Sequence, residues 1–268
     1  MIRVFARKNS FTPTDNLAFY DEPPLFDLPN LPVAVSVTFT WDIPRGRQLA
    51  VAWSFRCSYI SIGGPAFNDP GDEFFPGRFT KEGVTITSRG CPKNCPWCFV
   101  PKREGKLREL KIKPGYIVND NNLLACSQGH ILEVFDMLAN QKKGAEFKGG
   151  LDITYLSSWH VDLMKGIKVN ELWVACDSNV GLIRLEKAVD LLADFPTNKK
   201  RCYVLIGHDD DIAEAEDRLE TVYNMGFLPF AQLFRDGNKK KEYSKEWRAL
   251  ARKWSRPAAY RQRKGLGL

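Results

Sequence analysis

Residues 83–101 read GVTITSRGCPKNCPWCFVP, and this stretch decides the fold class and the chemistry that we expect of the chain. Its opening residues, 84–88, are rich in β-branched side chains and predict a short strand. Three cysteines follow in the spacing C-x3-C-x2-C, at Cys91, Cys95 and Cys98. Iron–sulfur clusters are held by cysteine thiolates, normally four for a four-iron cluster. Three ligands this close, with no fourth nearby, predict a cluster with one iron open to a small molecule.

The sequence after this strand alternates short β-rich runs with amphipathic stretches, which is typical of βα units around a parallel sheet. We expect strands at residues 84–88, 116–120, 145–149, 171–176, 202–207 and 228–234. We expect helices at 128–141, 155–165, 181–193 and 212–225, because apolar residues recur there at spacings of three and four. The charged link at 101–113 predicts at most a short helix.

The first 82 residues differ in composition. Five prolines within the first 32 residues predict mostly extended or irregular chain there. A single βαβ unit is expected next, with a strand at 33–38, a helix at 46–54 and a strand at 58–62 that runs into a Gly-Gly pair. One such unit cannot bury both of its faces. We therefore expect it to pack against the rest of the chain, with 68–78 as a linker.

The cysteine motif, with the aromatic Trp97 directly before its last cysteine, resembles that of the radical S-adenosylmethionine (SAM) superfamily. In that family the open iron of a [4Fe-4S] cluster binds SAM, and one electron cleaves SAM to a 5′-deoxyadenosyl radical. The radical then removes hydrogen from an unactivated carbon. The resemblance therefore implies a [4Fe-4S] cluster and SAM as cofactors, and a one-electron reductant such as flavodoxin or ferredoxin.

The resemblance extends from residue 83 to about residue 234 and implies an α/β fold, a partial (βα)6 TIM-like radical SAM barrel with a short N-terminal βαβ extension. Residues 1–82 are expected to form the extension, 83–234 the barrel, and 235–268 a basic aromatic helix and tail. The order of the parts resembles the cobalamin-binding and methylthiotransferase branches. The N-terminal part is too short for either, has no histidine before His130, and contains only Cys57 as a cysteine. We therefore expect a reduced relative without cobalamin or a second cluster.

Several strand ends carry residues that the resemblance implies as SAM ligands, in addition to Trp97. Two ends remain alternatives for the SAM amino group: Asp120 and Asn121 after the second strand, or Gly149, Gly150 and Asp152 after the third. Glycine permits close backbone approach, whereas a carboxylate or amide supplies an acceptor. Asp177 and Ser178 are implied for the ribose, and Ile206 and Gly207 for the adenine. The turn at 208–211 departs from the Pro-Gly-Glu turn of many relatives.

Four further cysteines stand alone and are expected to be buried structural thiols: Cys57, Cys126, Cys176 and Cys202. Cys176 also lies near a strand end, where it is a candidate hydrogen-atom donor to a product radical. A zinc site formed by the three clustered cysteines and a histidine such as His130 is the alternative to an iron–sulfur cluster. Zinc sites usually pair two short cysteine clusters, and the sequence contains one.

The net charge of +7 is concentrated near the end of the chain, since residues 235–268 contain 12 Lys and Arg against 3 Asp and Glu. Aromatic residues interleave with these cations, so the segment can contact phosphates and stack on bases. The candidate nucleic-acid contacts are Arg248, Arg252, Lys253, Arg256, Arg261 and Arg263. A solvated helix face with a frayed basic tail is the alternative.

The sequence thus predicts a radical SAM enzyme that modifies an unactivated carbon on a nucleic-acid base or nucleotide, so DNA, RNA or a nucleotide is the expected substrate. A peptide or small metabolite is the enzymatic alternative, and a zinc-stabilised nucleic-acid-binding module without catalysis is the non-enzymatic one. The seven cysteines are an odd number and unevenly spread, which is not typical of a secreted disulfide scaffold. No run of about 18 apolar residues occurs. We therefore expect a cytoplasmic protein with no membrane partner.

Overall fold

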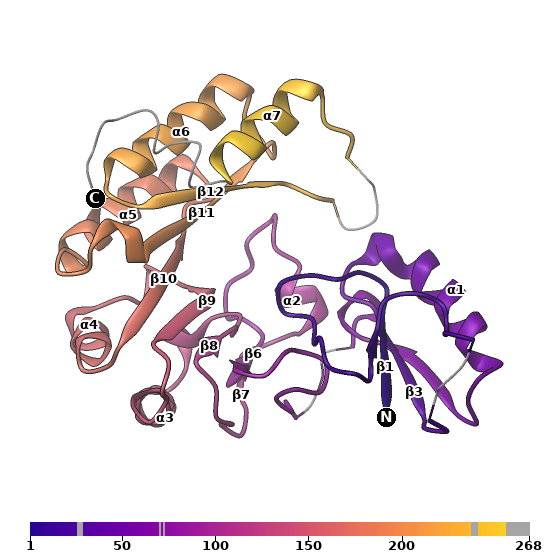
Figure 1. Ribbon diagram of the computed structural model, residues 1–268. Helices are drawn as coiled ribbons and strands as arrows, with labels where there is room; N and C mark the ends of the chain where they lie inside the picture. Colours follow the sequence, from indigo (N-terminus) through magenta and orange to yellow (C-terminus); the bar gives the residue numbers. More distant parts are fainter. Residues whose placement is uncertain (26–28, 70, 72, 237–240, 256–268) are drawn as a thin grey trace.

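The computed structural model shows an α/β protein built on two sheets of parallel strands (Figure 1). The structure describes residues 1–25, 29–69, 71, 73–236 and 241–255. We call the sheet formed after residue 83 the larger sheet, and the one formed before it the smaller sheet. Within the described residues no helix combines the length and apolar character needed to span a membrane.

The larger sheet contains all the strands predicted after residue 83. They are β5 (Val84–Thr85), β8 (Ile117–Val118), β9 (Ala145–Leu151), β10 (Val169–Ala175), β11 (Lys200–Ile206) and β12 (Leu228–Leu233). Each strand pairs in parallel with its neighbour in the sequence, so the order in space follows the order along the chain. Among the described strands β5 and β12 stand at opposite edges, and the sheet is not closed. The α/β class and the parallel arrangement are confirmed.

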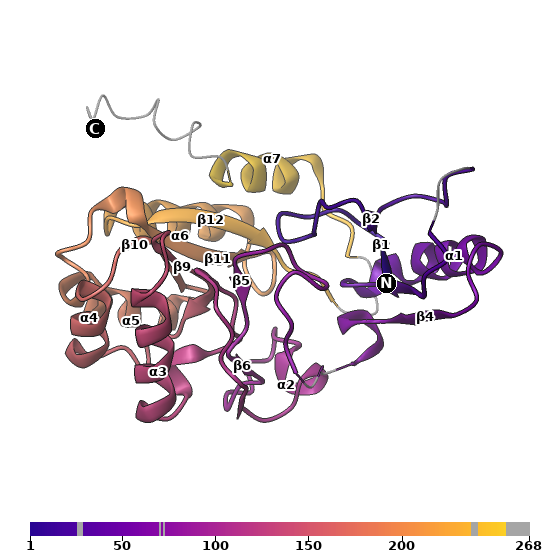
Figure 2. The ribbon, with the colours of Figure 1, turned by 60° about the horizontal axis from the view of Figure 1, so that its bottom comes forward.

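Helices cover one face of the larger sheet, and the strands curve around the other (Figures 1 and 2). The covering helices are α3 (Gln128–Ala139), α4 (Ser158–Lys165), α5 (Asn179–Leu191) and α6 (Ile212–Asn224), close to the predicted ranges. A side chain at the residue before the helix accepts a backbone N–H at the start of α3, α5 and α6, which fixes where they begin. α7 (Lys245–Trp254) lies beside α6 and packs on the sheet through Leu250 and Trp254.

The two faces of the larger sheet differ in chemistry because alternate residues of a strand point to opposite sides. Leu172 and Val174 of β10 are buried in the core under the helices. Glu171 and Trp173 face the other way, where Glu171 accepts hydrogen bonds from Lys148 Nζ at 2.6 Å and from Trp173 Nε1 at 2.8 Å. The inner face therefore holds a polar and aromatic layer, while the outer face is apolar.

The smaller sheet contains β1 (Ile2–Phe5), β2 (Ala18–Phe19), β3 (Val33–Ser36) and β4 (Ile60–Gly63) in the order β2-β1-β3-β4, all parallel. The predicted βαβ unit is present as β3, α1 (Ile43–Ser54) and β4. The expectation of mostly extended or irregular chain before it did not include β1 and β2, which pair as strands of this sheet. All residues of β1 are buried, so it is a central strand without alternation, and the prolines begin only after it.

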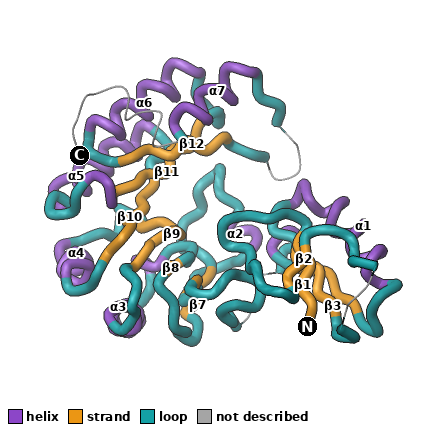
Figure 3. The backbone as a smooth tube through the Cα atoms, in the orientation of Figure 1, coloured by secondary structure: helices purple, strands orange, loops and turns teal. Residues whose placement is uncertain are grey.

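Short elements complete the described chain, and some of them lie between the two sheets. They are the 3-10 helices η1 (Thr40–Asp42), η2 (Pro65–Phe67), η3 (Leu123–Ala125) and η4 (Thr197–Lys199), the helix α2 (Val100–Arg103), and the strands β6 (Ser88–Arg89) and β7 (Arg108–Glu109). The chain between the sheets is mostly loop (Figure 3). Arg108 donates from Nη2 to the Gly71 carbonyl at 2.7 Å, and Lys113 pairs with Glu73 at 3.1 Å. These contacts join residues on either side of residue 83.

Candidate functional site

The three clustered cysteines lie in one loop, which we call the cysteine loop (residues 90–107). Its two ends meet because β6 and β7 pair in antiparallel register on either side of it. Across the base of the loop the Cys91 N–H donates to the Gly105 carbonyl at 3.3 Å. Gly90 has φ +79°, and a Cβ at this position would overlap the Lys106 carbonyl oxygen. Only glycine fits this close approach of the two strands of the loop.

All three cysteines are half-buried free thiols. The Cys98 N–H donates to the Cys95 carbonyl at 3.0 Å, which folds the second half of the motif into a tight turn. Burial raises the pKa of the Cys95 and Cys98 thiols, and the charges of Cys91 and Asp177 raise them further. These thiols are therefore close enough to influence one another. They must lose their protons to bind a metal.

Three consecutive side chains after β8 hold the start of the cysteine loop. Asp120 accepts from the Thr87 N–H and hydroxyl, both at 2.6 Å, and from the Ser88 hydroxyl at 2.9 Å. Asn121 Oδ1 accepts from the Gly90 N–H at 2.9 Å. Asp120 is fully buried, and burial raises the pKa of its carboxyl. The carboxyl oxygens of Asp120 and Oδ1 of Asn121 are thus engaged with the chain that leads to the cysteines.

Asn122 is the third of these side chains and contacts the motif directly. Its Nδ2 donates to Cys91 Sγ at 3.4 Å and to Asp152 Oδ2 at 3.0 Å. Its Oδ1 is buried and has no hydrogen-bond partner among the described residues. Such an orphaned acceptor costs free energy unless a ligand or water satisfies it. Asn122 is therefore a site residue that was not among the candidates named from the sequence, although it directly follows Asp120 and Asn121.

Asp152, after β9, lies on the same side as Cys91 and pairs with a lysine of the cysteine loop. Lys93 Nζ lies 2.7 Å from the Asp152 carboxylate and also contacts the Thr154 hydroxyl. Burial alone acts to raise the pKa of Asp152, but hydrogen bonds from Lys93 and Thr154 outweigh it and lower the pKa below its ordinary value. Lys93 was also missed from the sequence, although it stands between two of the motif cysteines.

The two glycines before Asp152 have different surroundings. A Cβ on Gly149 would overlap the Asp120 carbonyl oxygen, so this glycine permits the ends of β8 and β9 to approach each other. Gly150 has φ +92°, and no heavy atom of the described chain lies within 4 Å of the position its Cβ would occupy. The first glycine is required by packing, whereas the second borders open space.

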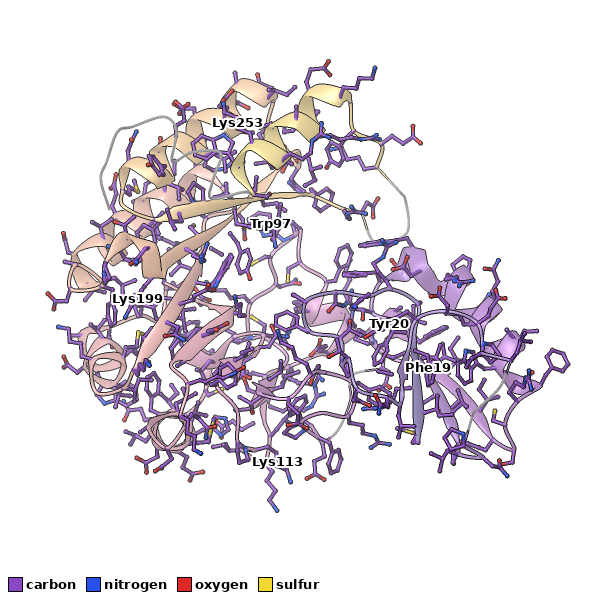
Figure 4. All side chains as sticks on the ribbon, in the orientation of Figure 1. Phe19, Tyr20, Trp97, Lys113, Lys199 and Lys253 are labelled. Atoms are coloured by element: carbon purple, nitrogen blue, oxygen red, sulfur yellow. The ribbon has the colours of Figure 1, made fainter. Side chains whose placement is uncertain are left out.

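Trp97 lies near the ends of β10 and β11, against residues that follow these strands (Figure 4). Its indole Nε1 donates to Asp177 Oδ2 at 3.3 Å, and its ring meets the ring of His208 edge to face, with centroids 5.8 Å apart. The His208 ring in turn meets the Phe234 ring edge to face, with centroids 4.5 Å apart. Burial raises the pKa of the Asp177 carboxyl. The structure thus brings Trp97 and Asp177 together and adds His208 and Phe234 to them.

The remaining residues implied near β10 and β11 have structural roles in the described chain. Ser178 caps α5 by accepting from the Gly181 N–H at 3.3 Å. Ile206 is fully buried in the core under the helices. Gly207 has φ +74°, and its carbonyl accepts from the Tyr243 hydroxyl at 3.1 Å. None of these contacts is to the cysteine loop.

Cys176 is fully buried and faces α5, where its Sγ donates to the Ser178 carbonyl at 3.8 Å. Burial raises the pKa of this thiol to about 12. Asp177 is the next residue and points to the opposite side, toward Trp97. The Cys176 thiol therefore lies away from the cysteine loop, and we do not assign it hydrogen-atom donation. Cys202 is also buried, whereas Cys57 and Cys126 are only half-buried.

The candidate nucleic-acid contacts divide into two groups. Arg248 and Arg252 are exposed on α7, while Lys253 forms an ion pair with Glu216 of α6. Arg256, Arg261 and Arg263 lie outside the described residues. Among these candidates in the described chain, the pairing leaves the two exposed arginines best placed to meet a phosphate.

Three thiols share one loop, and the Asn122 amide N–H is directed at one of them, as outer partners are at metal-binding thiolates. His130, the histidine proposed for zinc, instead contacts the Thr87 hydroxyl at 3.3 Å through Nε2 and lies near Glu109. In the described chain no three His, Cys, Asp or Glu side chains are gathered as a ready metal-binding group.

Comparisons with known proteins do not identify a family for this chain. No protein-family model matches the chain, and no curated protein matches it. The site must therefore be interpreted from its own geometry.

Proposed function

We propose that the chain is a radical SAM enzyme that modifies an unactivated carbon of a nucleic-acid base or nucleotide. The observation that carries this proposal is the position of the cysteine loop. The loop follows the first strand of a parallel sheet whose strands run in sequence order, which fits a partial (βα)6 TIM-like barrel. In βα barrels the reactive groups lie at the carboxyl ends of the strands. The Asn122, Asp152 and Asp177 side chains follow other strands of the same sheet.

Cys91, Cys95 and Cys98 would hold three irons of a [4Fe-4S] cluster, and the fourth iron would remain open to SAM. When bound, the cluster supplies the electron that cleaves SAM reductively to a 5′-deoxyadenosyl radical. The chain itself supplies the surroundings. Asn122 donates to the Cys91 sulfur, and Trp97 donates to the Asp177 carboxyl close to the motif.

The end of β8 offers the better acceptor for the SAM amino group, through Asn122. An ammonium or amine donor needs acceptors that are free to receive it. Asp120 already accepts three hydrogen bonds from Thr87 and Ser88. Asp152 likewise accepts from Asn122, Lys93 and Thr154. Asn122 Oδ1, by contrast, is a buried acceptor without a partner in the described chain. We therefore assign the amino group to Asn122 Oδ1.

The nucleic-acid substrate is supported by the exposed arginines of α7 and by the excess of cations after residue 234. A peptide or small metabolite is the alternative substrate of the same chemistry. Comparing digested DNA and RNA by mass before and after reaction, with SAM and dithionite present, would separate these classes. Dithionite here takes the place of a flavodoxin or ferredoxin.

The chemistry is tested by iron content and SAM cleavage after anaerobic purification. We expect a brown protein with about four irons per chain, which forms 5′-deoxyadenosine from SAM and dithionite. Cys95→Ala should lose both the iron and the product. Cys57→Ala is the matched control, because it removes a half-buried thiol from the smaller sheet and should keep both. A colourless protein that retains zinc would refute the proposal and favour the zinc-stabilised module.

A further inference from the structure

A cavity of about 540 Å³ lies between the two sheets, next to the site described above. The smaller sheet lines it with residues at the carboxyl ends of its strands, such as Phe5 of β1, Ser36 of β3 and Gly63 of β4. The larger sheet lines it with Ile86 and Asn119, which follow β5 and β8. Parallel sheets bind ligands outside the carboxyl ends of their strands. Two such edges therefore face one space of the size of a small-molecule site.

The cavity shares a wall with the cysteine loop. Arg89 lines it directly before Gly90, and Arg103 of α2 lines it from within the loop. Asn121 also lines the cavity while it accepts from the Gly90 N–H. The next residue, Asn122, donates to Cys91 Sγ. A ligand in the cavity would thus lie against the chain segments that hold the candidate cluster.

The lining is suited to a planar aromatic group. Phe11, Phe74, Phe75 and Phe79 contribute rings, and Phe75 and Phe79 remain 43% and 38% exposed. Arg78 lies over both of these exposed rings, at 5.6 and 5.4 Å from their centroids. Exposed rings in a concave site are stacking platforms for bases. Thr80 Oγ1 also belongs to this lining residue set, and it is buried with no partner among the described residues.

The lining also contains a cation that is not neutralised. Arg89 pairs with Glu104 at 3.2 Å, and Glu73 is occupied by Lys113. Arg103 is half-buried, and no carboxylate of the described chain forms an ion pair with it. A guanidinium in such a position is suited to bind a phosphate through paired N–H groups. The cavity therefore combines ring faces with the guanidinium of Arg103, and with that of Arg78, which lies over two of the rings.

We propose that this cavity holds the substrate as a single nucleotide unit, with its base on the ring of Phe79 and its phosphate on Arg103. The role as substrate rests on the proposed function, whereas nucleotide binding does not. The unit comes either from a free nucleotide or from a strand whose base is turned out of its stack. Both sources present the same base and phosphate to the cavity.

The test measures binding of each nucleoside 5′-monophosphate, and of a single-stranded DNA and RNA oligonucleotide, to the anaerobically purified protein by calorimetry. Arg103→Gln should weaken binding about tenfold or more, and Phe79→Leu should weaken it severalfold because stacking is lost. Lys102→Gln is the matched control, since it removes the same charge from the neighbouring exposed residue, which does not line the cavity. Binding by Lys102→Gln should equal that of the unaltered chain.

The experiment distinguishes a free nucleotide from a strand, and it tests the nucleotide cavity separately from the radical chemistry. Binding of monophosphates identifies a free nucleotide as the source, and binding of oligonucleotides alone identifies a strand. Either result supports nucleotide binding in the cavity if Arg103→Gln weakens that binding. Unchanged binding by both folded variants, or no binding of any probe, would overturn it. Formation of 5′-deoxyadenosine without nucleotide is measured on the same preparations. If that product is absent while Arg103-dependent binding persists, the radical chemistry fails and the nucleotide cavity stands.

Discussion

At the scale of single residues, the inner face of the larger sheet depends on one carboxylate. Glu171 accepts from Lys148 and Trp173, and Arg201 Nε lies 3.3 Å from its Oε1. The Trp173 ring stacks on Tyr203 with centroids 4.3 Å apart. Burial alone acts to raise the pKa of Glu171, but its hydrogen bonds and the neighbouring cations lower it below the ordinary value. The charged carboxylate therefore supports the layer beneath the site.

This carboxylate predicts a pH dependence of stability. Since the folded pKa of Glu171 lies below its unfolded value, its contribution is present above the unfolded pKa of about 4.3. It is lost as the pH falls through the lower folded pKa. Denaturant unfolding of the unaltered chain and of Glu171→Gln should differ at neutral pH, and the difference should shrink below about pH 4. A difference that stays constant through acid pH would show that packing, not charge, is responsible.

At the scale of elements, the cysteine loop is a closed unit because two short strands pair at its base. Its two positive-φ glycines have different surroundings. Gly90 faces the Lys106 carbonyl, whereas Gly105 has φ +73° and no heavy atom of the described chain within 4 Å of its Cβ position. Both positions are unfavourable for other residues, but only the first also has no room for a Cβ.

We therefore expect Gly90→Ala to open the base of the loop. Gly105→Ala should lower the free energy of unfolding by about 1–2 kcal/mol, the cost of the left-handed backbone alone. Gly90→Ala should cost more than this and should also lose bound iron after anaerobic purification. Thermal unfolding and iron analysis of the two variants check this pair. Equal iron retention by both would mean that the base of the loop does not position the cysteines.

At the scale of the whole molecule, the charge is unevenly placed. The exposed arginines of α7 lie on the side of the larger sheet covered by α6, and the ion pair of Lys253 with Glu216 joins these two helices (Figure 4). The loop that follows β12 returns to the smaller sheet, because the Arg235 guanidinium lies 4.5 Å from the Trp41 ring centroid. This contact joins the chain after β12 to η1, which follows β3 of the smaller sheet.

If α7 contacts a nucleic-acid backbone, its free and paired cations should differ. Arg248→Gln and Arg252→Gln should each reduce the slope of log affinity against log salt by about 0.7–0.9. Lys253→Gln should leave this slope unchanged, because its charge is already neutralised by Glu216. Fluorescence anisotropy with labelled DNA and RNA over a salt series measures the slopes. If all three variants keep the slope of the unaltered chain, α7 is not part of the interface.

Much of the fold follows from local sequence patterns. The strands and covering helices of the larger sheet were predictable because hydrophobic periodicity is a local property that burial on one face imposes. The cysteine spacing likewise is visible in a few consecutive residues. The strand β1 was not predictable in the same way, since a short fully buried strand has no alternation and its neighbours in the sheet come from distant segments. Helix ends shifted by a few residues because side-chain caps decide them.

The sequence by itself therefore determined that this is an α/β chain with three cysteines in a loop after a strand. Only the tertiary structure decided which side chains meet that loop. Asn122 and Lys93 contact the motif or its partner Asp152, whereas Cys176 and Ile206 point into the core. The cavity between the sheets also has no local sequence signal, because its walls come from loops far apart in the chain. Such sites arise when strand ends from separate segments are brought together by packing, and no short stretch of sequence records that.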